Sequence, residues 1–319
     1  MTRIAFCDIT GGPDMPALVY HLAYMLADQG RSPPVVDLDP TSRLTSMCLS
    51  EDRLDDIWCD DDDSRTIDGC VRLLLSDYEV DPTIEKLHLA LGLLPGGPEL
   101  AVLEEPLADA WARSKDIGAF VASSMVHRAT SLAEQAHAAD IVLMHLGPGR
   151  GAVNRAALLT ADHIVLSLTP NLISLHGLRV LGWAVATWRT AWQARSALPP
   201  VHLQPLGYIV TMPGAALSRQ GRVQHWYSQI SAKFRYAWRD ASKPTADPST
   251  DPWCLGLMRD YPGLRTLARE ARRPMFHLRP ADGAIGAQMT SVVRCREDFD
   301  RLARTLLTRA AELAEEAAL

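Results

Sequence analysis

Apolar residues along this chain form short uninterrupted runs that alternate with longer stretches in which they recur at helical spacing. Short apolar runs predict buried strands, and helical spacing predicts the amphipathic helices that lie between them. The expected strands cover 3–8, 35–40, 87–94, 139–148, 163–168, 205–211 and 274–278. The expected helices cover 17–26, 118–138, 152–160, 174–192, 218–239 and, at the end of the chain, roughly 287–316.

This alternation continues from end to end without a linker-like low-complexity segment, so we expect one α/β domain over residues 1–319. Strands that alternate with helices form a doubly wound, mostly parallel sheet flanked by helices. Residues 51–63 interrupt the pattern with eight acidic residues and one basic residue. A calcium site there would need spaced ligands and a glycine turn, which the segment lacks, so we expect a solvated surface loop.

Composition limits the classes of function. The net charge of −6 and the pI of about 5.9 disfavour a protein covered in positive charge, so nucleic-acid binding would have to come from a local patch. The six cysteines form no C-x-x-C pair, and isolated thiols indicate a reducing compartment. No stretch reaches the roughly 18 apolar residues of a membrane span, and the first residues lack the apolar run of a signal peptide. We therefore expect a cytoplasmic protein without a membrane span.

Three sequence motifs lie where the predicted strands end. The first strand leads through Gly11 and Gly12 into a helix, an arrangement in which backbone amides at the helix start can hold phosphate. The second strand ends in Asp37 and Asp39, within V-D-L-D-P-T-S-R-L-T. The fourth strand contains His145 and is followed by G-P-G-R-G-A-V-N-R-A-A-L.

Together with segments 161–182 and 270–287, these motifs and their order resemble the ParA/MinD family of deviant Walker P-loop ATPases. The resemblance runs across nearly the whole chain and implies a P-loop NTPase-like fold. Family members carry K-G-G-x-G-K-T-T in the first loop, where this chain reads T-G-G-P-D-M-P-A. The resemblance therefore implies that the nucleotide-binding motifs of this chain are degenerate.

The departures fall on positions with defined roles in the family. Thr10 replaces the signature lysine that reaches the partner's nucleotide, and Met15 replaces the lysine that neutralises the β- and γ-phosphates. Pro16 replaces the hydroxyl that binds Mg²⁺ and also lacks an N–H donor. Asp14 replaces a glycine, and His145 replaces an aspartate that helps to hold Mg²⁺. Asp37 and Asp39 remain where the family uses carboxylates to position water and magnesium.

These replacements oppose the binding of a polyanion. The missing ammonium removes a charge-assisted contact worth about 1.5–3 kcal/mol. A carboxylate such as Asp14 at about 4 Å from a phosphate charge would repel it by roughly 4 kcal/mol at an effective dielectric near 20. We expect no catalytic residues, no metal site and no nucleotide cofactor. Asp14 could instead cap the helix N-terminus with its own carboxylate, and Asp39 with Pro40 could simply form a strand-end turn.

A basic and aromatic segment over 217–243 is a candidate for nucleic-acid contacts, because such residues together bind phosphates and stack on bases. A second arginine-rich region lies at 259–279 and could extend the same patch. The alternative is an amphipathic helix, since Trp226, Ile230 and Phe234 share helical spacing. The candidate contacts are Arg219, Arg222, Lys233, Arg235, Arg239, Arg272 and Arg273.

The sequence therefore favours a ParA-like pseudo-ATPase that acts as a scaffold, regulator or dimer partner in a partition or positioning system. The resemblance implies a homodimer, or a heterodimer with a ParA-like relative. Two alternatives stay open. One is an active plasmid-partition or chromosome-segregation ATPase that binds Mg-ATP through unusual contacts. The other is a DNA- or cargo-binding module without nucleotide switching.

Overall fold

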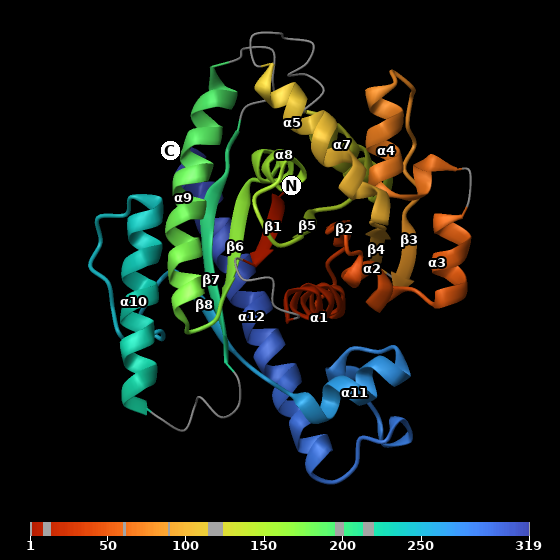
Figure 1. Cartoon of the computed structure of the whole chain (residues 1–319). Helices are drawn as coiled ribbons and strands as arrows, with labels where there is room; N and C mark the ends of the chain where they lie inside the picture. The colour runs from red at the N-terminus through yellow and green to blue at the C-terminus, as the bar shows by residue number, and fades with distance from the viewer. Residues whose placement is uncertain are drawn as a thin grey trace.

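The computed structural model describes residues 2–8, 14–59, 62–88, 90–113, 124–194, 201–212 and 220–318 (Figure 1). Its centre is a sheet that has the strand order β3-β4-β2-β5-β1-β6-β7-β8 in the described residues. Neighbouring strands pair in parallel except β3 and β4, which are antiparallel. The strands are β1 (Thr2–Asp8), β2 (Pro34–Leu38), β3 (Glu85–His88), β4 (Leu91–Leu94), β5 (Ile141–Leu146), β6 (His163–Leu168), β7 (Gln204–Met212) and β8 (Cys254–Arg259).

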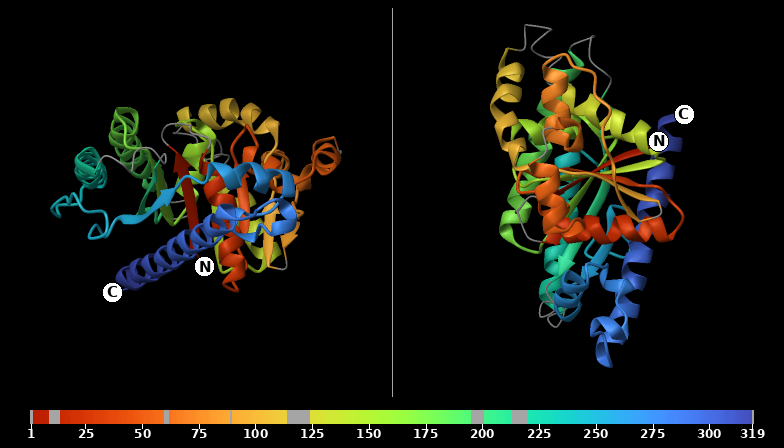
Figure 2. Two further views of the ribbon diagram at one scale, coloured as in Figure 1. Left: turned by 90° about the horizontal axis from the view of Figure 1, so that it is seen from below. Right: turned by 90° about the vertical axis from the view of Figure 1, so that its right-hand side faces the viewer.

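Helices cover both faces of the sheet (Figures 1 and 2). On one face lie α4 (Ile67–Leu75), α5 (Glu104–Ala112), α7 (Met125–His137), α8 (Ala152–Thr160), α9 (Leu172–Gln193) and α10 (Gln220–Trp238). On the other lie α1 (Asp14–Asp28), α2 (Arg43–Cys48), α3 (Glu51–Trp58), α11 (Pro262–Ala271) and α12 (Ala287–Ala318). Short 3₁₀ helices are η1 (Asp63–Arg65), η2 (Pro98–Leu103), η3 (Met275–His277) and η4 (Pro280–Asp282).

Strand β1 shows why the central strands read as uninterrupted apolar runs. Successive side chains of a strand point to opposite faces of the sheet. Ile4 and Phe6 pack into the apolar core on the α1 and α12 side, and Ala5 and Cys7 pack into the core on the α8 side. Because both faces are covered by helices, the middle of such a strand reads as a nearly continuous apolar run. The predicted α/β fold with a doubly wound, mostly parallel sheet is confirmed.

Two strand predictions need correction. The run at 87–94 is not one strand but parts of β3 and β4, which pair antiparallel around a turn at Ala90. The run at 274–278 contains η3 instead of a strand, and its buried Met275 and Phe276 pack against α1 and α12. The last strand is β8, which the sequence pattern did not predict. Several positions of β8 are exposed or half-buried because it lies at the sheet edge, so its apolar run is broken.

The acidic segment 51–63, which we expected to be a surface loop, is partly helical. Its first part forms α3, whose N-terminus is capped by the Ser50 hydroxyl, which accepts a hydrogen bond from the Arg53 amide. Leu54 and Ile57 are buried one turn apart, and the acidic residues lie on the exposed face. Carboxylates in the first turn of a helix stabilise it through the helix dipole, so the same residues that indicated a loop favour this helix.

The remaining predicted helices lie close to their expected positions. The described part of the 118–138 helix is α7, and residues 118–123 lie outside the described ranges. The helices expected at 152–160, 174–192, 218–239 and 287–316 correspond to α8, α9, α10 and α12. No helix in the described ranges has both the length and the apolar character that crossing a membrane requires.

Candidate functional site

The sheet brings the described residues of the predicted nucleotide site together at the carboxyl ends of its central strands. In an open α/β sheet, this edge is where ligands bind. Asp37 of β2 and His145 of β5 are paired directly in the sheet register, and Asp8 ends the adjacent strand β1. Helix α1 begins at the same edge, after residues 9–13. Thr10, Gly11 and Gly12 lie outside the described residues.

Asp37 is held on all sides by donors from its own chain. Its side chain is fully buried, and Oδ2 accepts hydrogen bonds from the Thr45 amide at 2.9 Å and the Thr45 hydroxyl at 2.7 Å. Oδ1 accepts from Nδ1 of His145 at 2.8 Å and from the Asp39 amide at 3.2 Å. A carboxylate offers about four lone-pair sites, so these four donors use its capacity. Asp37 therefore joins β2, β5 and α2.

Asp39 forms a local turn. It is fully buried, and its two oxygens accept from the Thr41 amide at 3.0 Å and the Thr41 hydroxyl at 2.6 Å. Nε of Arg43 lies 3.6 Å from Oδ2. The loop after β5 packs tightly over it, because a Cβ atom at Gly147 would lie 2.8 Å from Oδ1. The arrangement fits the strand-end turn that was one of the two predicted roles of Asp39.

Thr45 and Gly96 complete this cluster, and the prediction missed both. The Thr45 hydroxyl donates to Asp37 and accepts a hydrogen bond from the Gly96 amide at 3.0 Å. A Cβ atom at Gly96 would lie 2.6 Å from the backbone oxygen of Asp37, so this position requires glycine. Thr45 ends the V-D-L-D-P-T-S-R-L-T motif, and this motif was the sequence signal that could have indicated it. Its hydrogen-bond partners, however, come from β2 and from the loop after β4.

At the start of α1, the side chains turn into the protein. Met15 is 2% exposed and packs in an apolar cluster with Leu18 and Val19. Pro16 is also buried. Asp14 is the first residue of α1, but its side chain lies outside the described part of the chain, so its proposed capping role stays a prediction.

The described residues of this site do not fit a magnesium-bound phosphate group. Met15 is a buried thioether without charge, Asp37 has its acceptor capacity filled, and a histidine lies beside it in place of a hard oxygen ligand. In the part of the chain that the structure describes, no three His, Cys, Asp or Glu side chains come together in a way that could hold a metal ion. Burial, with the nearby charge of Asp8, raises the pKa of the Cys7 thiol to about 12, so that thiol is inert at neutral pH.

The candidate nucleic-acid residues are not equivalent in the structure. Arg235 is 4% exposed, and its Nη1 and Nη2 lie 3.1 and 3.0 Å from the two oxygens of Asp251. Its prediction as a nucleic-acid contact was wrong, because a guanidinium paired in the interior cannot meet phosphate. Lys233 and Arg239 are exposed on or just after α10. Arg219 and the Arg222 side chain lie outside the described residues.

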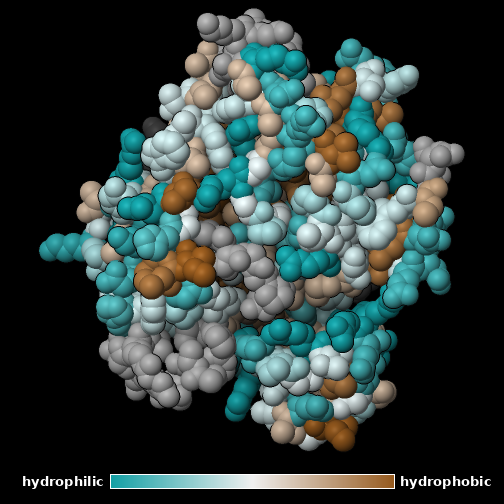
Figure 3. Space-filling view, in the orientation of Figure 1, coloured by the Kyte–Doolittle hydropathy of each residue, from teal (hydrophilic) through white to brown (hydrophobic). Residues whose placement is uncertain are grey.

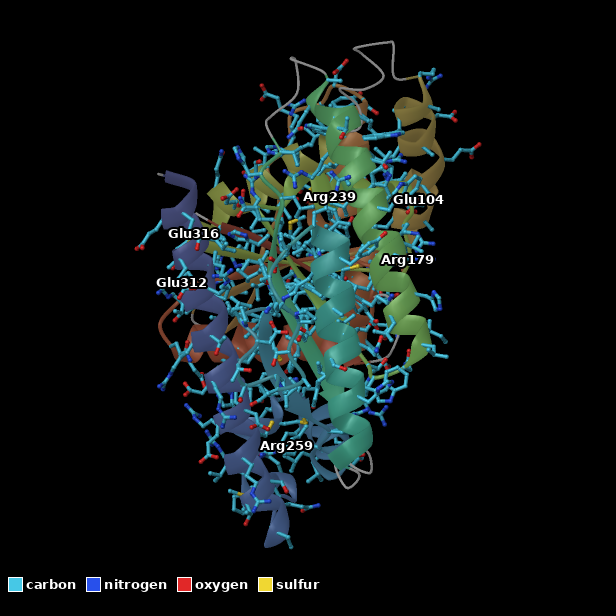
Figure 4. All side chains as sticks on the ribbon, turned by 90° about the vertical axis from the view of Figure 1, so that its left-hand side faces the viewer. Glu104, Arg179, Arg239, Arg259, Glu312 and Glu316 are labelled. Carbon is cyan, nitrogen blue, oxygen red and sulfur yellow. The ribbon has the colours of Figure 1, made fainter. Side chains whose placement is uncertain are left out.

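The two predicted basic regions also do not form one patch. Helix α10 covers one face of the sheet, and its aromatic residues Tyr227 and Phe234 are buried, as the amphipathic alternative predicted. Arg272 and Arg273 follow α11 on the opposite face, where both are exposed. Figure 4 shows Arg239 at the end of α10, well separated from Arg259 at the end of β8. Any contact of these groups with a long polyanion would involve two different surfaces.

Comparison with known sequences gives a family match. A family model described as an AAA domain matches residues 1–195. An uncharacterized protein of Methanocaldococcus jannaschii is 23% identical over 186 residues, which are 57% of this chain and 64% of that protein. The matched region thus spans slightly less than two thirds of the length of this curated relative.

Three solved structures share the fold across both chains. The Cyanothece McdA in complex with ATP is 13% identical, with a TM-score of 0.63 and coverage of 96% of each chain. The pNOB8 ParA bound to nonspecific DNA is 12% identical, with a TM-score of 0.61 and coverage of 98% of this chain and 99% of that one. A plasmid partition protein from Borrelia burgdorferi is 14% identical, with a TM-score of 0.57 and coverage of 97% and 98%.

Proposed function

We propose, because the chain belongs to the AAA domain family of the ParA/MinD type, that it is a ParA-like pseudo-ATPase of a partition or positioning system. In this role it binds and hydrolyses ATP poorly or not at all. It acts as a scaffold, a regulator or a dimer partner of an active relative. The fold of the family is kept, and the site at the carboxyl ends of the strands holds the protein together.

The single observation that carries this proposal is the saturation of Asp37. Phosphoryl transfer in P-loop enzymes depends on a lysine at the phosphates, a hydroxyl and carboxylate on magnesium, and a residue that positions water. Here the buried carboxylate of Asp37 accepts four hydrogen bonds from its own chain. Freeing it for a metal or a water would leave His145 and Thr45 without their partner in the interior.

A protein surface beside the site supports the role of dimer partner. On α9, the large apolar side chains of Leu172, Ile173 and Trp183 are 65%, 69% and 72% exposed. Figure 3 shows an apolar patch on this side of the molecule, over α9. Leu172 and Ile173 border a shallow pocket of about 380 Å³ that also contacts Arg150 of the loop after β5. Exposed apolar patches of this kind mark protein interfaces, and here a dimer would rest on protein contacts without nucleotide.

Calorimetric titration with Mg-ATP tests the proposal. We expect no heat of binding below millimolar nucleotide. The triple variant Asp14→Gly, Met15→Lys and Pro16→Thr should gain measurable binding if the first loop alone excludes nucleotide, and the matched control Asp14→Ala, Met15→Leu and Pro16→Ala should not. Micromolar binding by the natural chain would overturn the proposal in favour of a working partition ATPase with unusual contacts.

Nonspecific DNA binding is a second candidate function, favoured by the exposure of Lys233 and Arg239 on one side of the molecule. The similar pNOB8 ParA is bound to nonspecific DNA in its structure. Retention of a labelled DNA duplex should then fall steeply with salt and should weaken with Lys233→Glu and Arg239→Glu together. If these changes left DNA retention intact, this surface would not be the DNA-binding surface. Changes at Arg219 and Arg222 would then test the residues next to it in the sequence.

A further inference from the structure

A pocket of about 790 Å³ lies at the far end of α1 from the site described above. It is formed by the end of α1, one residue of β3, the segment 272–279 and the first turns of α12. Figure 2 shows α12 and the segment before it beside α1. Helix α1 has 15 residues, so about 20 Å separate the pocket from the helix start. We call it the arginine pocket.

The rim of the arginine pocket is strongly basic. Its charged lining consists of four arginines, one carboxylate and His277. The carboxylate is Asp28, and the arginines are Arg272, Arg273, Arg279 and Arg296. The side chains of Arg273 and Arg296 are 45% and 55% exposed. Their nearest carboxylate oxygens lie at 3.6 Å on Asp282 and 3.5 Å on Asp28, longer than the 2.7–2.9 Å of charge-assisted hydrogen bonds. These guanidinium groups therefore keep donors for an external acceptor.

Asp28 does not cancel this charge. It is 14% exposed, and Nε2 of His277 lies 2.8 Å from the same oxygen that Arg296 approaches. Arg272 uses one of its five donors on the Leu49 carbonyl at 3.0 Å, which fixes the guanidinium at the rim. Not counting His277, the four arginines and Asp28 give the lining a net charge of +3. In the described residues, none of these guanidinium groups forms a bidentate pair with a carboxylate.

The floor of the arginine pocket is apolar. Phe276 and Leu278 form part of it and are 4% and 3% exposed, and Val293 on α12 is 54% exposed to the pocket side. Leu87, Met289 and Val292 contribute further apolar surface. An apolar floor inside a basic rim selects a ligand that has both kinds of group. A DNA backbone contacts cations and needs no apolar floor, and inorganic phosphate could not cover it.

We propose that the arginine pocket binds a segment of a partner protein in which acidic side chains flank an apolar side chain. The carboxylates would pair with the rim arginines, which match planar carboxylates through two parallel N–H donors. The apolar side chain would cover Val293 and the floor. The half-exposed rim leaves the pocket open to the surface, as an extended or helical segment requires. A volume of about 790 Å³ lies within the range of concave ligand sites.

Fluorescence anisotropy with the full-length protein tests this proposal without nucleotide. The probe is a labelled twelve-residue peptide of Glu, Leu and Phe, and its counterpart carries Lys in place of every Glu. We expect the acidic peptide to bind at micromolar concentrations and the basic peptide to bind at least tenfold more weakly. Arg273→Glu with Arg296→Glu should weaken the acidic peptide at least tenfold, and Val293→Asp alone should weaken it several-fold.

The matched control is Arg301→Glu with Arg304→Glu, on the same helix but outside the pocket lining, where both side chains are more than 70% exposed. This variant should bind the acidic peptide as the natural chain does. Equal binding of both peptides, absence of binding, or binding of a labelled DNA duplex that competes with the peptide would each overturn the proposal. A dimer that dissociates in Arg273→Glu with Arg296→Glu would also overturn it, because the occupant would then be a second copy. None of these outcomes depends on whether Mg-ATP binds.

Discussion

Helix α1 connects two charged regions that differ in how their charges are paired. At its start, the carboxylates Asp37 and Asp39 are fully buried and accept their hydrogen bonds from the same chain. At its end, the guanidinium groups of Arg273 and Arg296 are half-exposed, and their carboxylate partners in the described residues lie 3.6 and 3.5 Å away. A charged group with all its partners inside the chain stabilises the fold. A charged group with unused hydrogen-bond donors is available for a ligand.

Position in a family motif does not by itself mark a binding group. The resemblance assigns Asp37 and Asp39 to positions where the family uses carboxylates, yet both are fully buried and bonded within their own chain, as structural residues are. The arginine pocket overlaps the arginine-rich region 259–279, which the sequence indicated only as a possible nucleic-acid contact, and its half-exposed arginines are the basis for the binding role that we propose. Measurements that separate stability from binding can therefore test each region in turn.

Removal of the Asp37 side chain should have the largest effect. Asp37→Ala would leave the donors of Thr45 and His145 unpaired in the interior, and breaking a buried polar network of this kind costs about 3–5 kcal/mol. The free energy of unfolding from urea titration measures it, with exposed Glu105→Ala as a control that should change it by less than about 0.5 kcal/mol. A neutral or stabilising effect of Asp37→Ala would assign this carboxylate to a functional site.

His21, midway along α1, should give the next largest effect through pH. Its Nδ1 donates to the Ala17 carbonyl and its Nε2 accepts from the Met275 amide, which ties α1 to the wall of the arginine pocket. Burial lowers the pKa of His21 to about 4 from 6.5. The unfolded chain thus binds a proton at a higher pH, so stability present above pH 6.5 is lost as the pH falls toward 4. The loss should amount to about 3 kcal/mol.

Urea titrations between pH 7 and 4 measure this loss. The variant His21→Phe cannot take up the proton and keeps an aromatic ring beside Phe276 and Phe299. The difference in unfolding free energy between the natural chain and this variant should shrink as the pH falls. A pH-independent difference would mean that His21 is not held neutral between α1 and η3.

Met15→Lys tests the start of α1 itself. Because Met15 is 2% exposed in an apolar cluster, an ammonium there should lower the unfolding free energy by about 2 kcal/mol, with the long side chain partly reaching toward water. Met15→Leu, which conserves volume, should cost less than about 1.5 kcal/mol. If millimolar Mg-ATP raised the melting temperature of Met15→Lys alone, the rest of the site would be able to bind nucleotide. The carboxylates at the start of α1 would then not be purely structural.

Charge reversal at the arginine pocket should have the smallest effect on stability. Arg273 and Arg296 are half-exposed and make only long ion pairs, which contribute about 0–1 kcal/mol. Arg273→Glu with Arg296→Glu should therefore change the unfolding free energy by less than about 1 kcal/mol while it weakens peptide binding at least tenfold. A loss of several kcal/mol would show that these arginines hold the fold.

The central sheet was predictable because burial on both faces leaves an uninterrupted apolar run in each central strand. The same rule failed at the edges. Strand β8 is partly exposed, and the run at 87–94 gives no sign that the chain reverses direction within it. The run at 274–278 is apolar because Met275 and Phe276 are buried, which does not require a strand.

The site was predictable only as far as strand ends define it. Asp37 and His145 could be placed on adjacent strands, but the hydrogen bonds that fix their role come from Thr45 and the loop at Gly96. Arg235 was misassigned because its partner Asp251 lies beyond α10, and a charge pattern does not reveal a tertiary ion pair. The arginine-rich region 259–279 was visible in the sequence, but the pocket also needs α1, β3 and α12, so no local pattern could show that a pocket forms there.

Calorimetric titration of the natural chain with Mg-ATP is the most direct test of the central claim, that the strand-end carboxylates have become structural. We expect no binding below millimolar nucleotide, and we expect Asp37→Ala to lower the unfolding free energy without changing the affinity for nucleotide. Micromolar binding that Asp37→Asn abolishes, with the fold intact by circular dichroism, would contradict it.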